Sequence, residues 1–139
     1  MRIFFYGLYM DAALLESMGY GPTHVGAARL DDFRLRIGSR ATLIQEHGRA
    51  SYGFLLDLPD EEASALYSRP EVAGYVPTQV QVTLLADSTL HPASCYLLAT
   101  DEGPAEPNVE YASKLVALTT RLGLPAAYVE EIAAIARGC

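Results

Sequence analysis

The alternation of apolar and polar residues predicts β-strands over most of the first hundred positions. Residues 76–84 give the clearest pattern, because apolar or β-branched side chains alternate there with polar ones, as in a strand with one buried face. The apolar run at 3–6 ends at Gly7 and predicts a buried strand that opens into a loop, where backbone N–H groups can hold an anion. Further strands are predicted at 24–37, with a bend at Asp31-Asp32, and at 42–44, 50–58 and 93–99, with a turn over 45–49 joining the middle pair.

Helical spacing predicts two short helices and, at the end of the chain, two longer ones. Residues 10–18 have an N-cap in Asp11 and a stop in Gly19, and the other helices are expected at 60–67, 109–122 and 126–137, with a loop over 101–107 before the last two. Strands thus come first and helices last, which indicates an α+β fold. We predict a mixed, curved β-barrel-like sheet with flanking short helices and two C-terminal helices.

Composition and charge narrow the class of partner. The 139 residues fit one domain with a core and a small pocket. With 10 basic and 17 acidic residues and a net charge of −7, the chain lacks the Lys and Arg clusters on which nucleic-acid binding depends. No apolar stretch approaches the roughly 20 residues of a membrane span, and the N-terminal segment has no cleavage pattern of a secretory signal. We expect a cytoplasmic protein without nucleic-acid or membrane partners, as a monomer or homodimer.

Cysteine and histidine predict no metal centre. Cys95 and Cys139 are too few for a disulfide scaffold, and we expect Cys95 to pack in a strand. The three histidines are scattered, with no spacing typical of metal ligands and no serine or cysteine placed as a nucleophile beside them.

Several ordered motifs resemble the γ-glutamylcyclotransferase family. Tyr6-Gly7 followed by Tyr9-Met10 is similar to the family's Tyr-Gly loop, and residues 28–35 are similar to the strand that follows it. Residues 53–56, Glu71 with the strand after it, 107–111 and 123–128 match the rest of the pattern in order. The resemblance runs nearly end to end and implies a single γ-glutamylcyclotransferase-like domain over residues 1–139.

The resemblance implies a cofactor-independent reaction, an intramolecular aminolysis of the acyltransferase or lyase type. The α-amine of a γ-glutamyl amine or amino acid attacks its own γ-carbonyl, which gives 5-oxoproline and releases the amine. The catalytic residue falls on Glu71. Substrate contacts fall on Ile3, Phe4, Phe5, Tyr6, Gly7, Leu8 and Tyr111. Tyr75 is predicted either to line the same pocket or to pack at the start of a strand.

One carboxylate can perform both proton transfers of this reaction. It accepts a proton from the substrate ammonium and then donates one to the leaving nitrogen. We predict that partial burial, against Tyr75 or Val72, raises the pKa of Glu71 toward neutrality. Because Leu8 stands where the family has Ser or Thr, a second interpretation stays open: a catalytically weak or inactive small-molecule binding protein on the same scaffold.

Overall fold

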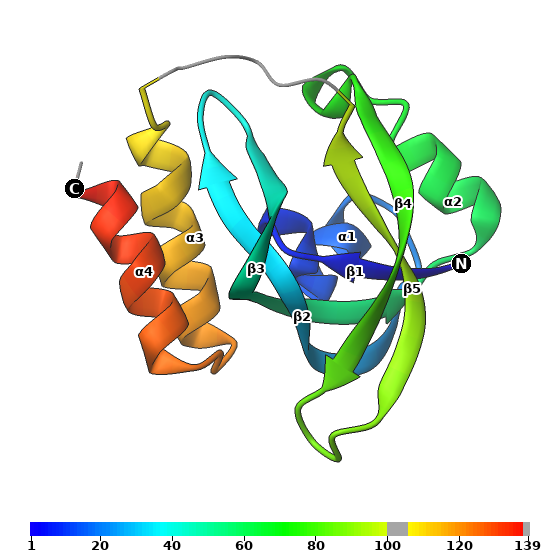
Figure 1. Cartoon of the computed structure of the whole chain (residues 1–139). Coiled ribbons are helices and arrows are strands. Elements are labelled where there is room, and N and C mark those ends of the chain that lie inside the picture. Colours follow the sequence, from blue (N-terminus) through cyan, green and yellow to red (C-terminus); the bar gives the residue numbers. More distant parts are fainter. Residues whose placement is uncertain (100–105, 138–139) are drawn as a thin grey trace.

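The protein is a closed five-stranded barrel with helices packed around it (Figure 1). The computed structural model describes residues 1–99 and 106–137, so most of the loop predicted over 101–107 lies outside the described residues. The strands are β1 (Arg2–Phe5), β2 (Thr23–Ile37), β3 (Ala41–Asp57), β4 (Tyr75–Leu84) and β5 (Leu90–Leu98). The helices are α1 (Ala12–Ser17), α2 (Asp60–Leu66), α3 (Val109–Arg121) and α4 (Ala126–Ala136), with 3-10 turns η1 (Leu8–Met10) and η2 (Pro70–Val72). The predicted fold class is confirmed.

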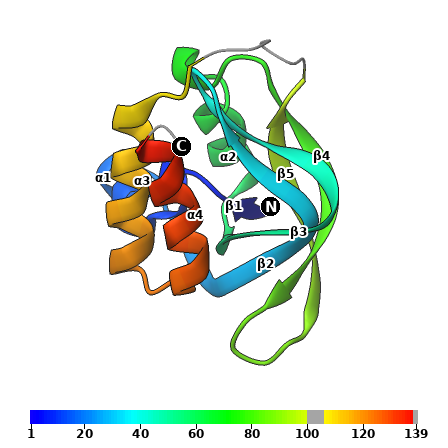
Figure 2. The same cartoon turned by 60° about the vertical axis from the view of Figure 1, so that its left-hand side comes forward.

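The barrel is mixed because one of its strand pairs is parallel. Around it the strands run in the order β1-β3-β2-β4-β5, and β1 meets β5 in parallel where Ile3 pairs with Ser94. The other paired strands are antiparallel. Figure 2 shows α3 and α4 side by side against one flank of the barrel. Ring closure leaves the paired strands without long open edges.

The connection between β2 and β3 differs from the prediction. The chain turns at residues 38–40, and the strand predicted as two pieces is one continuous β3. The segment 45–49 is not a turn but an irregularity in the ladder, opposite the predicted bend. There Asp32 has φ of 65° and accepts a hydrogen bond from the Gly48 N–H at 3.0 Å. A bulge bends a strand and increases its twist without ending it, which lets these two long strands curve around the barrel.

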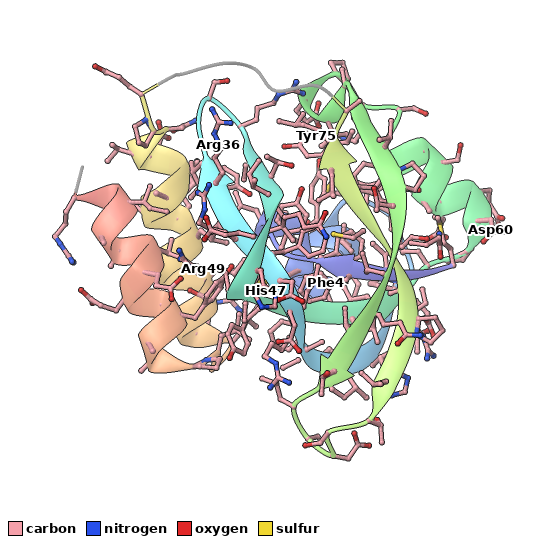
Figure 3. All side chains as sticks on the ribbon, viewed as in Figure 1. Phe4, Arg36, His47, Arg49, Asp60 and Tyr75 are labelled. Atoms are coloured by element: carbon pink, nitrogen blue, oxygen red, sulfur yellow. The ribbon has the colours of Figure 1, made fainter. Side chains whose placement is uncertain are left out.

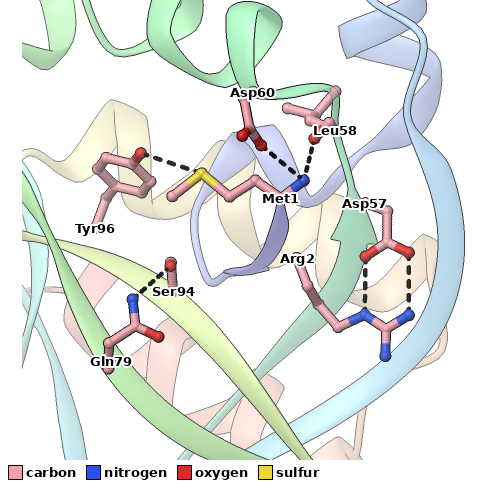
Figure 4. A network of polar contacts seen from close by, with 8 residues as sticks. All are labelled: Met1, Arg2, Asp57, Leu58, Asp60, Gln79, Ser94 and Tyr96. Atoms are coloured by element: carbon pink, nitrogen blue, oxygen red, sulfur yellow. Dashed lines mark hydrogen bonds and ion pairs between the residues drawn. The ribbon is translucent and has the colours of Figure 1, made fainter.

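The first strand is anchored to the end of β3, which determines where the following loop lies. Arg2 makes a bidentate pair with Asp57, with Nε and Nη2 donating to its two carboxylate oxygens at 2.8 and 3.0 Å (Figure 4). The Leu58 N–H donates to the Met1 carbonyl at 2.8 Å. Ile3 is fully buried, and the strand therefore runs through the core and delivers residues 6–8 to one end of the barrel.

The start of α3 is tied to the β2–β3 turn. Asn108 caps the helix, since its side-chain oxygen accepts from the Tyr111 N–H at 3.0 Å. The Asn108 N–H donates to the Gly38 carbonyl at 2.9 Å, and its amide donates to the Ser39 carbonyl at 3.4 Å. These bonds bring the first turn of α3 and the turn at 38–40 to the same end of the barrel.

Candidate active site

A cavity of about 300 Å³ opens at that end of the barrel. Its walls come from the end of β1, η1, the β2–β3 turn, the segment from α2 to β4, β5 and α3. Figure 3 shows Tyr75 at this end, where β4 begins. The lining residues are Phe5, Tyr6, Gly7, Leu8, Tyr9, Ser39, Arg40, Ala41, Tyr67, Glu71, Val72, Tyr75, Tyr96 and Tyr111.

Most of the predicted site residues lie in this cavity. It is lined by the predicted catalytic glutamate together with Phe5, Tyr6, Gly7, Leu8, Tyr75 and Tyr111. The other two predicted contact residues, Ile3 and Phe4, do not line it. They expose 0% and 1% of their surface and belong to the barrel core. Their part is to hold β1 in place.

The loop after β1 approaches α3 closely. Gly7 has extended backbone angles, φ −110° and ψ −156°, so its conformation does not itself require glycine. The limited space at this position favours glycine instead, because a Cβ would lie 2.4 Å from the Tyr111 hydroxyl oxygen. That hydroxyl accepts a hydrogen bond from the Leu8 N–H at 3.3 Å, and burial raises the pKa of Tyr111 to about 12. Tyr111 therefore stays protonated at neutral pH and holds the loop.

Glu71 lies on η2 at the cavity, but its environment differs from the prediction. Its side chain is 51% exposed and pairs with Arg69, whose Nε donates to Oε1 at 2.6 Å. This hydrogen bond holds the pKa of Glu71 below its usual range. The predicted rise in pKa is wrong, because partial burial was expected to dominate and the neighbouring guanidinium dominates instead.

Arg40 is a cavity residue that the sequence analysis missed. Its guanidinium carbon lies 5.3 Å from the centre of the Tyr75 ring, in cation–π geometry. Its Nη1 donates to the Ala73 carbonyl, and the Tyr75 hydroxyl donates to the Ala41 carbonyl. A single arginine in a turn forms no sequence pattern that indicates a binding site, so the sequence did not identify Arg40.

Tyrosine rings form much of the remaining wall. The rings of Tyr67 and Tyr96 stack with centroids 3.6 Å apart, and Tyr9 meets Tyr67 edge-on at 6.5 Å. The Tyr6 hydroxyl donates to the Tyr96 carbonyl at 2.6 Å. Burial raises the pKa values of Tyr6 and Tyr67 well above the usual value, so both hydroxyls stay protonated at neutral pH. The abundance of tyrosine, nine residues in a chain without tryptophan, was the available signal for this wall.

The described residues contain neither a metal-binding group nor a membrane-spanning helix. In residues 1–99 and 106–137, His, Cys, Asp and Glu side chains form no group of three that could hold a metal ion. Within the same ranges, no helix combines the length and apolar character that crossing a membrane requires.

Comparison with known proteins identifies relatives of this architecture. The family model described as AIG2-like family matches residues 51–132, more than half of the chain. A solved structure named gamma-glutamyl cyclotransferase superposes with a TM-score of 0.83 at 22% identity, covering 96% of this chain and 86% of that one. The structure of an uncharacterized protein from Homo sapiens superposes with a TM-score of 0.82 at 23% identity and the same coverage of both chains. The structure of YkqA from Bacillus subtilis superposes with a TM-score of 0.81 at 24% identity, and the match covers 99% of this chain and 54% of the YkqA chain. No curated protein matches the sequence. At these identities the structural likeness shows the fold.

Proposed function

Because this chain belongs to the AIG2-like family, we propose that it is an enzyme of the γ-glutamylcyclotransferase type, which cyclises a γ-glutamyl amine or amino acid to 5-oxoproline. The observation that carries the proposal is the meeting of Gly7, Leu8 and Glu71 around one cavity. These segments are more than sixty residues apart in the chain. A cavity of about 300 Å³ stands at the small end of ligand sites, roughly 300–1,000 Å³, which favours a small donor molecule.

The reaction needs one base, one acid and correct orientation. The α-amine nitrogen forms a bond to the γ-carbonyl carbon, the bond from that carbon to the leaving nitrogen breaks, and no water is consumed. The α-nitrogen loses two protons as it changes from an ammonium to a lactam N–H, and the leaving nitrogen gains two as it changes from an amide N–H to an ammonium. Holding amine and carbonyl in contact contributes strongly, because effective molarities for well-placed groups reach about 10⁵–10⁸ M.

Glu71 suits the first proton transfer in its observed state. A carboxylate with a lowered pKa is ionised at neutral pH and can accept a proton without prior deprotonation. Its position at the cavity and its 51% exposure leave it accessible to a substrate ammonium, which would share the carboxylate with Arg69. After accepting the proton, the same carboxyl group is the acid for the leaving nitrogen.

A second candidate function is small-molecule binding without turnover. Leu8 carries no hydroxyl, and its N–H already donates to Tyr111 at 3.3 Å, so a ligand must compete with the Tyr111 hydroxyl for this donor. A pocket with this competition can still capture a γ-glutamyl compound through its remaining contacts.

One assay separates the two functions. The protein is incubated with a panel of γ-glutamyl amines and γ-glutamyl dipeptides, and 5-oxoproline is measured. We expect release by the wild type and a loss of about 10²- to 10⁴-fold in kcat for Glu71→Gln with binding retained, as for removal of a general acid–base group. Glu61→Gln, an exposed glutamate on α2 outside the cavity, is the matched control. Binding of panel members without any 5-oxoproline would instead establish the second function.

A further inference from the structure

Among the described residues that line the cavity, one side chain is cationic, and it lies in a turn that other contacts hold in place. Arg40 closes the β2–β3 turn, where the Gly38 N–H donates to the Arg40 carbonyl at 3.1 Å. Asn108 binds the carbonyls of both Gly38 and Ser39 from the start of α3. The side chain is held as well, by the Ala73 carbonyl and the face of Tyr75. Arg40 is thus positioned from three elements.

Charge distinguishes Arg40 from the rest of the wall. Of the cavity residues that the structure describes, Arg40 carries the positive charge and Glu71 the negative charge, and the others are uncharged. The chain as a whole has a net charge of −7 and only 10 basic residues. A generally basic protein surface therefore does not explain why a cation lines the cavity. Opposite charges on the walls of one small cavity match a ligand that carries both an ammonium and a carboxylate.

A γ-glutamyl donor has these two charges. Its ammonium must approach Glu71 for the proposed reaction, and its carboxylate needs a partner elsewhere in the cavity. The Leu8 N–H already donates to the Tyr111 hydroxyl at 3.3 Å, so a ligand carboxylate must compete for it. A guanidinium keeps its charge in every pair, has five N–H donors, and fits a carboxylate through a planar fork.

We propose that Arg40 is the carboxylate-binding residue of this cavity and so sets its preference for γ-glutamyl donors with a carboxylate. The proposal rests on the proposed function. Two carboxylates are chemically equivalent candidates, namely the α-carboxylate of the glutamyl group and the carboxylate of a leaving amino acid. Both would pair with the guanidinium in the same way, and substrates that lack one or the other distinguish them.

Three donors and two variants test the assignment. γ-Glutamyl-alanine has both carboxylates, γ-glutamyl-ethylamine lacks the one on the leaving group, and 4-aminobutyryl-alanine lacks the α-carboxylate and would close to pyrrolidin-2-one. For Arg40→Gln we expect kcat/KM for γ-glutamyl-alanine to fall about 10- to 100-fold, as for a lost charged hydrogen bond. The donor that lacks the bound carboxylate should lose no more than about twofold. Arg40→Lys, which keeps the charge without the fork, should fall between wild type and Arg40→Gln.

Controls separate binding from folding and from net charge. Lys114→Gln removes one positive charge from the outer face of α3, where Lys114 is 62% exposed, and should leave every donor unchanged. Thermal unfolding of each Arg40 variant shows whether loss of the Ala73 contact has disturbed the fold. A similar loss for all three donors in a folded Arg40→Gln protein would overturn the proposal.

A binding measurement keeps this inference distinguishable from the proposed function. In the Glu71→Gln background, calorimetry gives Kd for the three donors with Arg40 intact and with Arg40→Gln. If Arg40→Gln weakens binding only of the donors that carry the recognised carboxylate, the inference is supported. It is supported even if the wild type releases no cyclic product, because that absence of product refutes only the proposed function. Turnover and Kd that are insensitive to Arg40, or no binding of any donor, refute the inference.

Discussion

The close approach of the β1 loop to α3 predicts an energetic coupling between Gly7 and Tyr111. In Gly7→Ala the added Cβ would lie 2.4 Å from the Tyr111 hydroxyl oxygen, whereas the next atom of that ring is 3.8 Å away, an ordinary contact. Relief by rotation of the tyrosine would break its hydrogen bond with the Leu8 N–H. We expect Gly7→Ala to cost about 1–3 kcal/mol of unfolding free energy, the usual range for overpacking.

Removing the hydroxyl should remove most of this cost. Tyr111→Phe by itself loses one hydrogen bond, about 0.5–1.5 kcal/mol. In the Tyr111→Phe background, Gly7→Ala meets a ring carbon at ordinary contact distance and should cost less than about 1 kcal/mol. The double-mutant cycle, measured by urea unfolding of the four proteins, should give a coupling of about 1 kcal/mol or more.

Gly53→Ala is a control in which the added Cβ meets a backbone atom, which no side-chain substitution can remove. A Cβ there would lie 2.0 Å from the Phe5 carbonyl oxygen, which belongs to the backbone of β1 and cannot move away alone. Gly53→Ala should therefore cost about 3 kcal/mol or more, and Tyr111→Phe should not reduce that cost. Equal costs for Gly7→Ala in the two backgrounds would refute the contact between loop and helix on which the site geometry depends.

Three further predictions follow from individual contacts. In Arg69→Gln the cause of the lowered Glu71 pKa is lost, so that pKa rises and the acidic limb of the kcat/KM profile, which requires ionised Glu71, moves to higher pH. An unmoved limb would show that another group controls it. Cys95 is fully buried, and burial raises its pKa strongly. In a Cys139→Ser protein the Cys95 thiol should therefore resist a disulfide reagent until urea unfolds the chain. Rapid labelling of the folded protein would contradict this. Tyr6→Phe deletes a buried donor to a β5 carbonyl and should lower the unfolding free energy by about 1–3 kcal/mol in urea titrations, an effect that a solvated hydroxyl would not give.

The sequence determined the elements whose signals are local. Alternation along 76–84 predicted the strand observed as β4, which starts one residue earlier. Asp11 was predicted as a cap, and its carboxylate accepts from the Ala13 N–H at 3.1 Å. The buried position of Cys95 was also correct. Each of these depends on neighbours within a few residues, where side-chain period and capping geometry act directly.

Tertiary structure decided what local signals leave ambiguous. The polar, glycine-containing segment 45–49 has the composition of a turn, but the same composition permits a bulge. Only the pairing of Gln45 and Ala50 with β2 made the segment part of one long strand. Arg69 and Glu71 are neighbours in sequence, yet their pairing depends on side-chain directions that the 3-10 turn imposes. For that reason the pKa of the predicted catalytic group moved opposite to expectation.

The sequence by itself thus predicted two segments that the structure brings to one cavity, namely the loop after β1 and the acidic residue before β4. It did not determine their electrostatic setting. Arg40 meets Tyr75 across 35 positions of chain because the barrel closes and a helix cap holds the turn that carries Arg40. Contacts of this range arise from the packing of whole elements, and no pattern of neighbouring residues encodes them.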